Sequence, residues 1–368
     1  MKNNIQHTCK VMIALTSILF DASQYPSLAA CTGISLKTIT GSIICGRTLE
    51  FAQSLDSHIL FIPRNYALRG VGPDGKLNGL AWKSKYAAVG ANALHYTEII
   101  DGINEKGLAG GLFYFTDYEY QTVSAQEVSR CIASWQLITW ILTTCATIDE
   151  VKSRLPHIKI GKAPLPEWGI EVPIHAILHD PTGACIVIEY IKGKLIIYDN
   201  PLGVLTNNPS FDWHITNLRN YVNLTAIDVP KIKLSDINIR SSGAGSGMLG
   251  IPGDFTPPSR FIRAVAFTQS STQPQNESQG VDMVFHLLNL FDIPRGSVRT
   301  KNNNKLLIEY TQWTSVSDTH VPTYYFHTYN NRQIKKISLA QLNLNRKTTQ
   351  IVAMESAQKI EDLSPKLK

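Results

Sequence analysis

Short apolar runs with strand-like alternation dominate the chain after residue 30. The first two, 31–36 and 42–47, are joined by Thr40-Gly41, which predicts an antiparallel hairpin. Further strands are predicted at 87–91, 108–115, 174–178, 185–190, 194–198, 305–311 and 323–328. Helical periodicity is found at 124–144, 147–155, 213–221, 259–269 and 281–290. Strands clustered toward both ends, with helices in two blocks, predict one α+β domain with layered sheets.

The apolar run at 11–20 has a different character. It follows Lys2 and Lys10 and precedes a polar stretch that ends in Ser27-Leu28-Ala29-Ala30. This is the pattern of a secretory signal peptide, and the run is too short to span a bilayer as a permanent helix. We therefore expect residues 1–30 to be removed and the protein to be periplasmic or secreted. Residues 31–345 are predicted to form the domain, and 346–368 a charged C-terminal tail.

Cleavage after Ala30 would give Cys31 both a thiol and a free α-amine. An α-amine has a pKa of about 7.7–8.0, so it can act as the general base for the thiol of its own residue. Two alternatives remain open. Cys31 could be an ordinary structural cysteine, or Leu28-Ala29-Ala30-Cys31 could be a bacterial lipoprotein site at which Cys31 is acylated. The polar stretch between the apolar run and Cys31 argues against the lipoprotein alternative.

Composition narrows the functional classes. The chain has 368 residues, 43% of them apolar, and a net charge of +6 with no dense basic tract, so we expect no nucleic-acid partner. No later run is apolar enough to cross a membrane.

Five cysteines follow residue 30, and an odd number leaves at least one free thiol. The pairing of Cys45, Cys131, Cys145 and Cys185 stays open. No CxxC or HExxH motif is present, so no metal site is predicted.

The predicted hairpin would bring Arg47 and Glu50 close to Cys31. A guanidinium beside the thiol would favour the thiolate, and a carboxylate could orient the α-amine. The alternative is an exposed ion pair that contributes little to stability.

A second candidate follows the apolar run 204–206, where Asn207 and Asn208 precede a proline. An amide at a strand end can donate a hydrogen bond to an oxyanion. The alternative is a simple Asn-Pro turn.

The most glycine-rich stretch is 243–254, in which Gly245, Gly247 and Gly250 satisfy GxGxxG. No clear strand precedes it, so a loop that leads into the helix at 259–269 fits better than a dinucleotide site. Arg260 and Arg263 would lie in the first turn of that helix. This is an unfavourable place for cations, which indicates that one of them has a specific partner.

Together these segments resemble the choloylglycine hydrolase family, which includes bile salt hydrolases and penicillin V acylases. The resemblance runs from Cys31 to about residue 339 and rests on motifs that occur in the same order. They are Cys31-Thr32, 46–51, 104–108, 205–212, 251–254 with 259–261, and 311–314.

The resemblance implies an αββα sandwich of the N-terminal nucleophile hydrolase type and hydrolysis of a linear, non-peptide amide. It implies Cys31 as nucleophile and base, Arg47 and Arg260 near the thiol, and an oxyanion hole formed by Asn207 and the N–H of Phe113. It also implies a small acyl-amide substrate, no cofactor or metal, no stable membrane association and a possible homo-oligomer, a tetramer in the family.

Two residues depart from the bile salt hydrolase pattern. Glu50 stands where those enzymes usually have Asp, and Phe113 where many have Asn. Both departures resemble the Gram-negative branch of the family. The bile salt and penicillin V substrate classes therefore stay open, together with an acyl-homoserine-lactone acylase of the same chemistry. A lipid-anchored, non-catalytic protein acylated at Cys31 is the alternative from another class.

Overall fold

The computed structural model describes residues 30–302 and 305–367, so the predicted leader lies outside the described residues except for Ala30. A six-stranded sheet contains both strands of the first hairpin. Its strand order is β1 (Cys31–Lys37), β2 (Ile43–Phe51), β19 (Lys305–Asp318), β20 (Thr323–Thr328) and β21 (Lys335–Ser338), with β18 (Val298–Asn302) paired to β19. The predicted hairpin is present, and β2 lies between β1 and the long strand β19.

An eight-stranded antiparallel sheet forms the second β layer. Its order is β15 (Lys194–Asp199), β14 (Cys185–Ile191), β13 (Ile174–His179), β8 (Ala109–Tyr114), β7 (Asp101–Asn104), β6 (Ala88–Ala91), β3 (His58–Ile62) and β22 (Gln350–Ala353). Strand β22 pairs with β3 and lies within the segment predicted as a charged tail, so the sheet extends into that segment.

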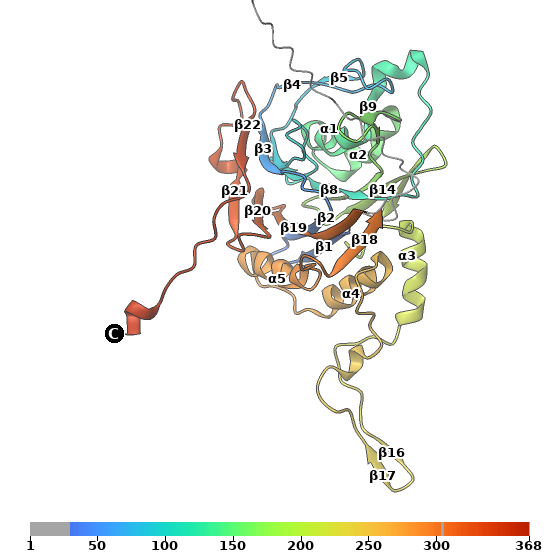
Figure 1. The fold of residues 1–368 in the computed structure, drawn as a ribbon, viewed down its shortest axis with the longest axis vertical. Helices are drawn as coiled ribbons and strands as arrows, with labels where there is room; N and C mark the ends of the chain where they lie inside the picture. The colour runs from blue at the N-terminus through green and yellow to red at the C-terminus, as the bar shows by residue number, and fades with distance from the viewer. Residues whose placement is uncertain (1–29, 303–304, 368) are drawn as a thin grey trace, which may run out of the picture.

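Helices cover the outer face of each sheet, which gives the αββα layering seen in Figure 1. Helices α1 (Leu137–Thr144) and α2 (Ile148–Arg154) lie on the side of the eight-stranded sheet. Helices α4 (Pro257–Ser270) and α5 (Glu277–Asn289) pack on β1, β2 and β19. The shorter helix α3 (Phe211–Asn217) lies beside α4.

Alternation along a strand explains how one sheet serves two cores. In β3, Leu60 and Ile62 belong to the core under α1 and α2, whereas Ile59 and Phe61 belong to the core between the two sheets. Strand β2 is buried along almost its whole length, because one face packs on the other sheet and the other on α5. A strand with two buried faces can hold a charged group away from water, and β2 carries Arg47 and Glu50.

The continuous helix predicted at 124–144 is wrong. Only Leu137–Thr144 is α-helical, and it is preceded by 3₁₀ turns and by the strand β9 (Cys131–Ala133). Strand β9 pairs in parallel with β10 (Lys159–Gly161), and its three residues are buried. Tertiary pairing therefore overrides the local helical pattern.

Three small hairpins lie outside the layers. They are β4 (Ala67–Arg69) with β5 (Ala81–Lys83), β11 (Pro164–Leu165) with β12 (Ile170–Glu171), and β16 (Ile232–Leu234) with β17 (Ile237–Ile239). The β16–β17 hairpin projects away from the body of the molecule (Figure 1). No helix in the described part of the chain is long and apolar enough to cross a membrane. The five cysteines after residue 30 are all free thiols.

Close approach of the central strands requires a glycine at position 90. Gly90 pairs with Gly102, and a Cβ at Gly90 would lie 2.0 Å from the carbonyl oxygen of Asp101. We predict that Gly90→Ala lowers the free energy of unfolding by about 1–3 kcal/mol through this clash. Denaturant unfolding measures the effect. Gly253→Ala is the control, because a Cβ there meets no atom within 4 Å. Equal stability of the two variants would contradict this packing.

Candidate active site

The β1–β2 hairpin brings Arg47 to the thiol of Cys31, as its spacing predicted. Gly33 pairs with Arg47, and the Nη2 atom of Arg47 donates to Cys31 Sγ at 2.7 Å. The same guanidinium donates to the carbonyl oxygens of Leu112 and Thr48, and its Cζ lies 4.2 Å from the centroid of the Phe113 ring. Backbone acceptors and an aromatic face therefore fix its orientation, and the exposed ion pair considered above is excluded.

A short β-bridge places Asn207 beside the backbone of Cys31. Gly33 and Leu205 exchange two backbone hydrogen bonds, and Asn207 follows directly after this bridge. The backbone N–H of Cys31 donates to Asn207 Oδ1 at 2.8 Å, and Asn207 Nδ2 donates to the carbonyl oxygen of Tyr114 at 2.7 Å. Asn208 lies elsewhere, where its side chain accepts from Thr116 N–H.

Arg260, on the second turn of α4, is the arginine with the specific partners. It is buried, and its Nη1 atom donates to the Cys31 carbonyl oxygen and to Thr32 Oγ1, while Nη2 donates to Asn207 Oδ1 at 2.7 Å. Burial lowers the pKa of Arg260, and the nearby Glu50 opposes that shift. Arg263 instead donates to the carbonyl oxygens of Pro252 and Asp254, where it holds the loop before α4.

The backbone N–H that faces the Cys31 thiol belongs to Tyr114. The prediction that Phe113 supplies this N–H is therefore wrong. Phe113 pairs with His175 of β13, and Phe115 N–H donates to the next carbonyl on that side. Backbone groups alternate along an antiparallel strand, so Phe113 N–H faces β13 and Tyr114 N–H faces the opposite way. Tyr114 N–H contacts Cys31 Sγ, and it also lowers the pKa of that thiol. A strand prediction without a register could not distinguish these neighbours.

The Glu50 carboxyl group is buried, and only one of its two oxygens has a hydrogen-bond partner. Its Oε1 atom accepts from Thr311 Oγ1 at 2.8 Å, whereas Oε2 has no hydrogen-bond partner. Its backbone N–H donates to the carbonyl oxygen of Ala30. Burial raises the pKa of Glu50 to about 7, against the opposing effect of Arg260.

The electrostatics of the thiol are a balance between burial and charge. Burial raises the pKa of Cys31, and this is the largest effect. Arg47 acts in the opposite direction and lowers that pKa, while Glu50 raises it and Arg260 lowers it. Two guanidinium groups thus counter the desolvation of a buried thiolate.

Sequence reasoning missed two histidines that hold the backbone around Asn207. His175 contacts the Thr206 carbonyl oxygen through Nε2 at 3.0 Å and Glu189 through Nδ1 at 3.1 Å. His214 Nε2 lies 2.9 Å from the Asn207 carbonyl oxygen. Both carbonyl oxygens only accept, so each Nε2 must carry the proton. The only signal in the sequence was a histidine inside an apolar strand and another in a short helix.

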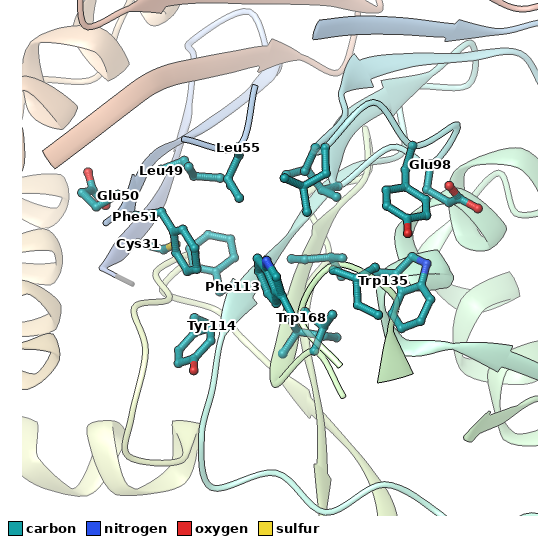
Figure 2. Close-up of a pocket in the computed structure, with 18 of the residues that line it drawn as sticks. Cys31, Leu49, Glu50, Phe51, Leu55, Glu98, Phe113, Tyr114, Trp135 and Trp168 are labelled. Carbon is teal, nitrogen blue, oxygen red and sulfur yellow. The ribbon is translucent and has the colours of Figure 1, made fainter. Parts of the chain in front are cut away.

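Cys31 lies at one end of a pocket that is lined mainly by apolar side chains. Figure 2 shows Cys31, Phe113 and Tyr114 at that end and Glu98 and Trp135 at the other. The wall between them is largely apolar, and Phe51 stacks on Trp168 with ring centroids 5.5 Å apart. A pocket with this apolar wall suits an apolar group. Within residues 30–302 and 305–367, no group of three or more His, Cys, Asp or Glu side chains is arranged to hold a metal ion.

The raised pKa of Glu50 predicts a pH-dependent stability of the unprocessed chain. The pKa is about 7 in the folded state against an ordinary 4.5, so the folded state binds more protons between these values. The free energy of unfolding should therefore fall as the pH rises from 4.5 to 7, by at most about 1.4 kcal/mol per pH unit. Glu50→Gln should remove this part of the dependence. Denaturant titrations across that window, run on both proteins, measure the difference, and parallel curves would contradict the assignment.

Comparison with known proteins identifies the family. The family profile of linear amide C–N hydrolases, choloylglycine hydrolase family, matches residues 31–353. The chain is similar to a bile salt hydrolase/transferase of Clostridium perfringens (strain 13 / Type A), with 37% identity over 86% of this chain and 94% of the relative. It is also similar to a penicillin V acylase of Pectobacterium atrosepticum, with 25% identity over 82% of this chain and 78% of the relative.

Solved structures agree with this result. A crystal structure of a mutant conjugated bile acid hydrolase from Clostridium perfringens superposes with a TM-score of 0.81 and 32% identity, covering 91% of this chain and all of that one. The penicillin V acylase from Agrobacterium tumefaciens has a TM-score of 0.71 at 21% identity, covering 88% of this chain and 91% of that one, which shows a shared fold. The expected four-layer α+β fold and the linear-amide hydrolase class are thereby confirmed. The chain belongs to the choloylglycine hydrolase family of linear amide C–N hydrolases.

Proposed function

We propose that this protein is an exported cysteine N-terminal nucleophile hydrolase that cleaves acyl amides with a bulky apolar acyl group. One observation carries the proposal: the Cys31 thiol, contacted by Arg47, lies at the end of a mainly apolar pocket. The acyl group occupies the pocket, and the amide carbon lies against Sγ.

The chemistry begins with the removal of residues 1–30. Once the peptide bond before Cys31 is cut, the nitrogen that now donates to Asn207 becomes an amine, and its unprotonated form takes the thiol proton. Sγ attacks the amide carbon, and the oxyanion receives the N–H of Tyr114 and the second N–H of the Asn207 amide. The protonated amine then returns the proton to the leaving nitrogen. Water finally hydrolyses the thioester and releases the acid.

Two features support processing at this position. The family profile begins at residue 31, and the signal-peptide pattern ends at Ala30. Removing Ala30 would also free the backbone N–H of Glu50, which donates to the Ala30 carbonyl oxygen in the uncut chain. Export to the periplasm or the medium follows from the leader.

A bile salt or penicillin V type of amide is the substrate class we propose, since relatives with these names share the fold and most of the chain. An acyl-homoserine lactone is the alternative, because a long acyl chain would also fill an apolar pocket. A homo-oligomer is a further expectation. The projecting β16–β17 hairpin supports it through exposed apolar side chains, namely Ile232, Leu234, Ile237 and Ile239.

We predict that Cys31→Ala abolishes hydrolysis across a panel of glycocholate, taurocholate, penicillin V and long-chain acyl-homoserine lactones, because the nucleophile is lost. Cys185→Ala is the matched control: this half-buried thiol does not line the pocket, and the variant should keep its activity. The exported wild type should have the intact mass of Cys31–Lys368 and should remain in the soluble fraction.

Substantial turnover by Cys31→Ala would refute the assignment of the nucleophile. A mass increased by a diacylglyceryl group, with the protein in the membrane fraction, would instead support the lipid-anchored alternative.

Arg260 should act by positioning. Its guanidinium bridges the Cys31 carbonyl, Thr32 and Asn207, and a lysine ammonium cannot span the three. We predict that Arg260→Lys lowers kcat on the order of 10²-fold with little change in KM, because the oxyanion donor and the nucleophile lose their relative placement. Arg263→Lys, on the same helix, is the control and should stay close to wild type. A similar loss in both variants would point to damage to α4 rather than to the site.

A further inference from the structure

Asp101 places a buried carboxylate between the two sheets, beside Arg47. It belongs to β7 of the eight-stranded sheet and is buried. Its Oδ2 atom accepts from Ser315 Oγ of β19 at 2.6 Å and from Tyr324 Oη of β20 at 2.7 Å. Ser315 is the residue that pairs with Arg47 in the ladder between β19 and β2. The carboxylate is therefore bound to the opposite sheet, next to the arginine that contacts the thiol.

The other oxygen of Asp101 lies close to the guanidinium. A Cβ on Gly111 would lie 2.5 Å from Asp101 Oδ1 and 3.4 Å from Arg47 Nη1, so the two groups flank the same point of β8. Both residues also line one small cavity between the sheets. Burial raises the pKa of Asp101, and Arg47 is the strongest of the groups that lower it. Opposite charges this close interact strongly where water is excluded.

Two arginines and two carboxyl groups form two pairs around Cys31. Side chains alternate along a strand, so Arg47 and Glu50 of β2 point to opposite faces of the sheet. Burial raises the pKa of Glu50, and Arg260 opposes this shift more strongly than Arg47 does. The arginine that opposes the same shift in Asp101 is Arg47. Each guanidinium thus has its own carboxyl group, and Asp101 is the one beside Arg47.

We propose that Asp101 is a positioning residue for the hydrolysis: its carboxylate is the countercharge that keeps the Arg47 guanidinium aimed at Cys31 Sγ. This inference rests on the proposed function, in which Cys31 is the nucleophile. The carbonyl oxygens of Thr48 and Leu112 accept hydrogen bonds from Arg47, but they carry no net charge. A buried guanidinium without a countercharge is unfavourable, so loss of the carboxylate should displace Arg47 toward water or another acceptor.

A purely structural role for Asp101 would lie in its two hydrogen bonds, which join β7 to β19 and β20. Ser315→Ala and Tyr324→Phe each remove one of these bonds and keep the charge. Asp101→Asn keeps an acceptor oxygen at nearly the same size and removes the charge. These variants therefore separate a countercharge from a brace between the sheets.

The test measures two quantities on the processed chain, Cys31–Lys368. The first is kcat and KM for the best substrate of the amide panel. The second is the pH dependence of Cys31 alkylation by iodoacetamide. The mass of the N-terminal peptide reports this alkylation, so the other four thiols do not contribute.

For Asp101→Asn we expect kcat to fall about tenfold or more with little change in KM, because the nucleophile loses a positioned partner. The alkylation profile should move to higher pH, because Arg47 lowers the pKa of the Cys31 thiol. Loss of a negative charge alone would move the profile to lower pH, so the sign of the shift identifies a displaced arginine. Glu50 and Arg260, which also act on the thiol, and the α-amine are the same in every variant.

The remaining titratable groups near Asp101 do not enter this readout. Burial and then the charge of Asp101 raise the pKa values of Cys45 and Tyr324, and His179 lines the same cavity. None of them belongs to the peptide whose mass is followed. Ser315→Ala and Tyr324→Phe should lower Tm while keeping the wild-type profile and kcat.

A double variant tests whether Asp101 acts through Arg47. In Arg47→Met, the further change Asp101→Asn should not move the profile to higher pH, because the guanidinium is already absent. If Asp101→Asn alone fails to fold, recovery of the fold in the double variant supports the charge pair. Failure of both to fold would assign Asp101 a structural role and overturn the proposal.

An unchanged alkylation profile in Asp101→Asn would also overturn the positioning role, as would an equal shift in Ser315→Ala and Tyr324→Phe. A wild-type protein that hydrolyses none of the amides would instead overturn the proposed function, and the alkylation profiles would still decide the relation between Asp101 and Arg47.

Discussion

The hydrogen bond from the Cys31 nitrogen to Asn207 Oδ1 is the contact on which the rest of the site depends. It joins the first residue of β1 to a loop that lies 176 positions away in sequence. The bridge between Gly33 and Leu205 brings the two segments together, and Arg260 reaches from α4 to the same amide oxygen. Because Asn207 Oδ1 accepts both of these hydrogen bonds, its Nδ2 group is directed to the other side, where it donates to the Tyr114 carbonyl oxygen. The orientation of a single amide thus links the nucleophile, its nitrogen and the oxyanion donors.

Burial imposes a second constraint, because the fold places charged groups between two sheets. Cys31, Arg47, Glu50 and Arg260 are all nearly inaccessible to solvent. Their desolvation favours the neutral thiol and the neutral carboxyl, and each guanidinium acts against it. Few isolated ions are tolerated in such an environment, but a set of opposite charges with directed hydrogen bonds is. The site therefore needs all of its members, and the αββα layering supplies the rigid backbone that holds them.

Much of this arrangement could be predicted from the sequence. The elements and contacts that could not be predicted were missed for physical reasons. The 31–47 hairpin, nine of the fourteen strands of the two main sheets and the helices at 148–154 and 257–270 follow local patterns, so the sequence predicts them. The 124–144 helix was wrong because parallel pairing with β10 overrides the helical periodicity of 131–133. The approach of Arg47 to Cys31 follows from hairpin spacing, whereas the choice between Phe113 and Tyr114 depends on a register that spacing alone does not determine. His175 and His214 act through the backbone of a distant loop, and no local pattern reports such a contact.

Two carboxyl groups of pocket-lining residues are buried with one oxygen left without a hydrogen-bond partner. Glu50 and Glu98 each have one oxygen bonded to a neighbour and one without a partner, and burial raises the pKa of both. A fold selected for stability alone would have no reason to keep either. If the chain is cut before Cys31 as proposed, an α-amine forms near Glu50, whose charge already acts on the Cys31 thiol. Processing would therefore add a titratable amine beside a thiol and a carboxyl whose pKa values burial has already raised.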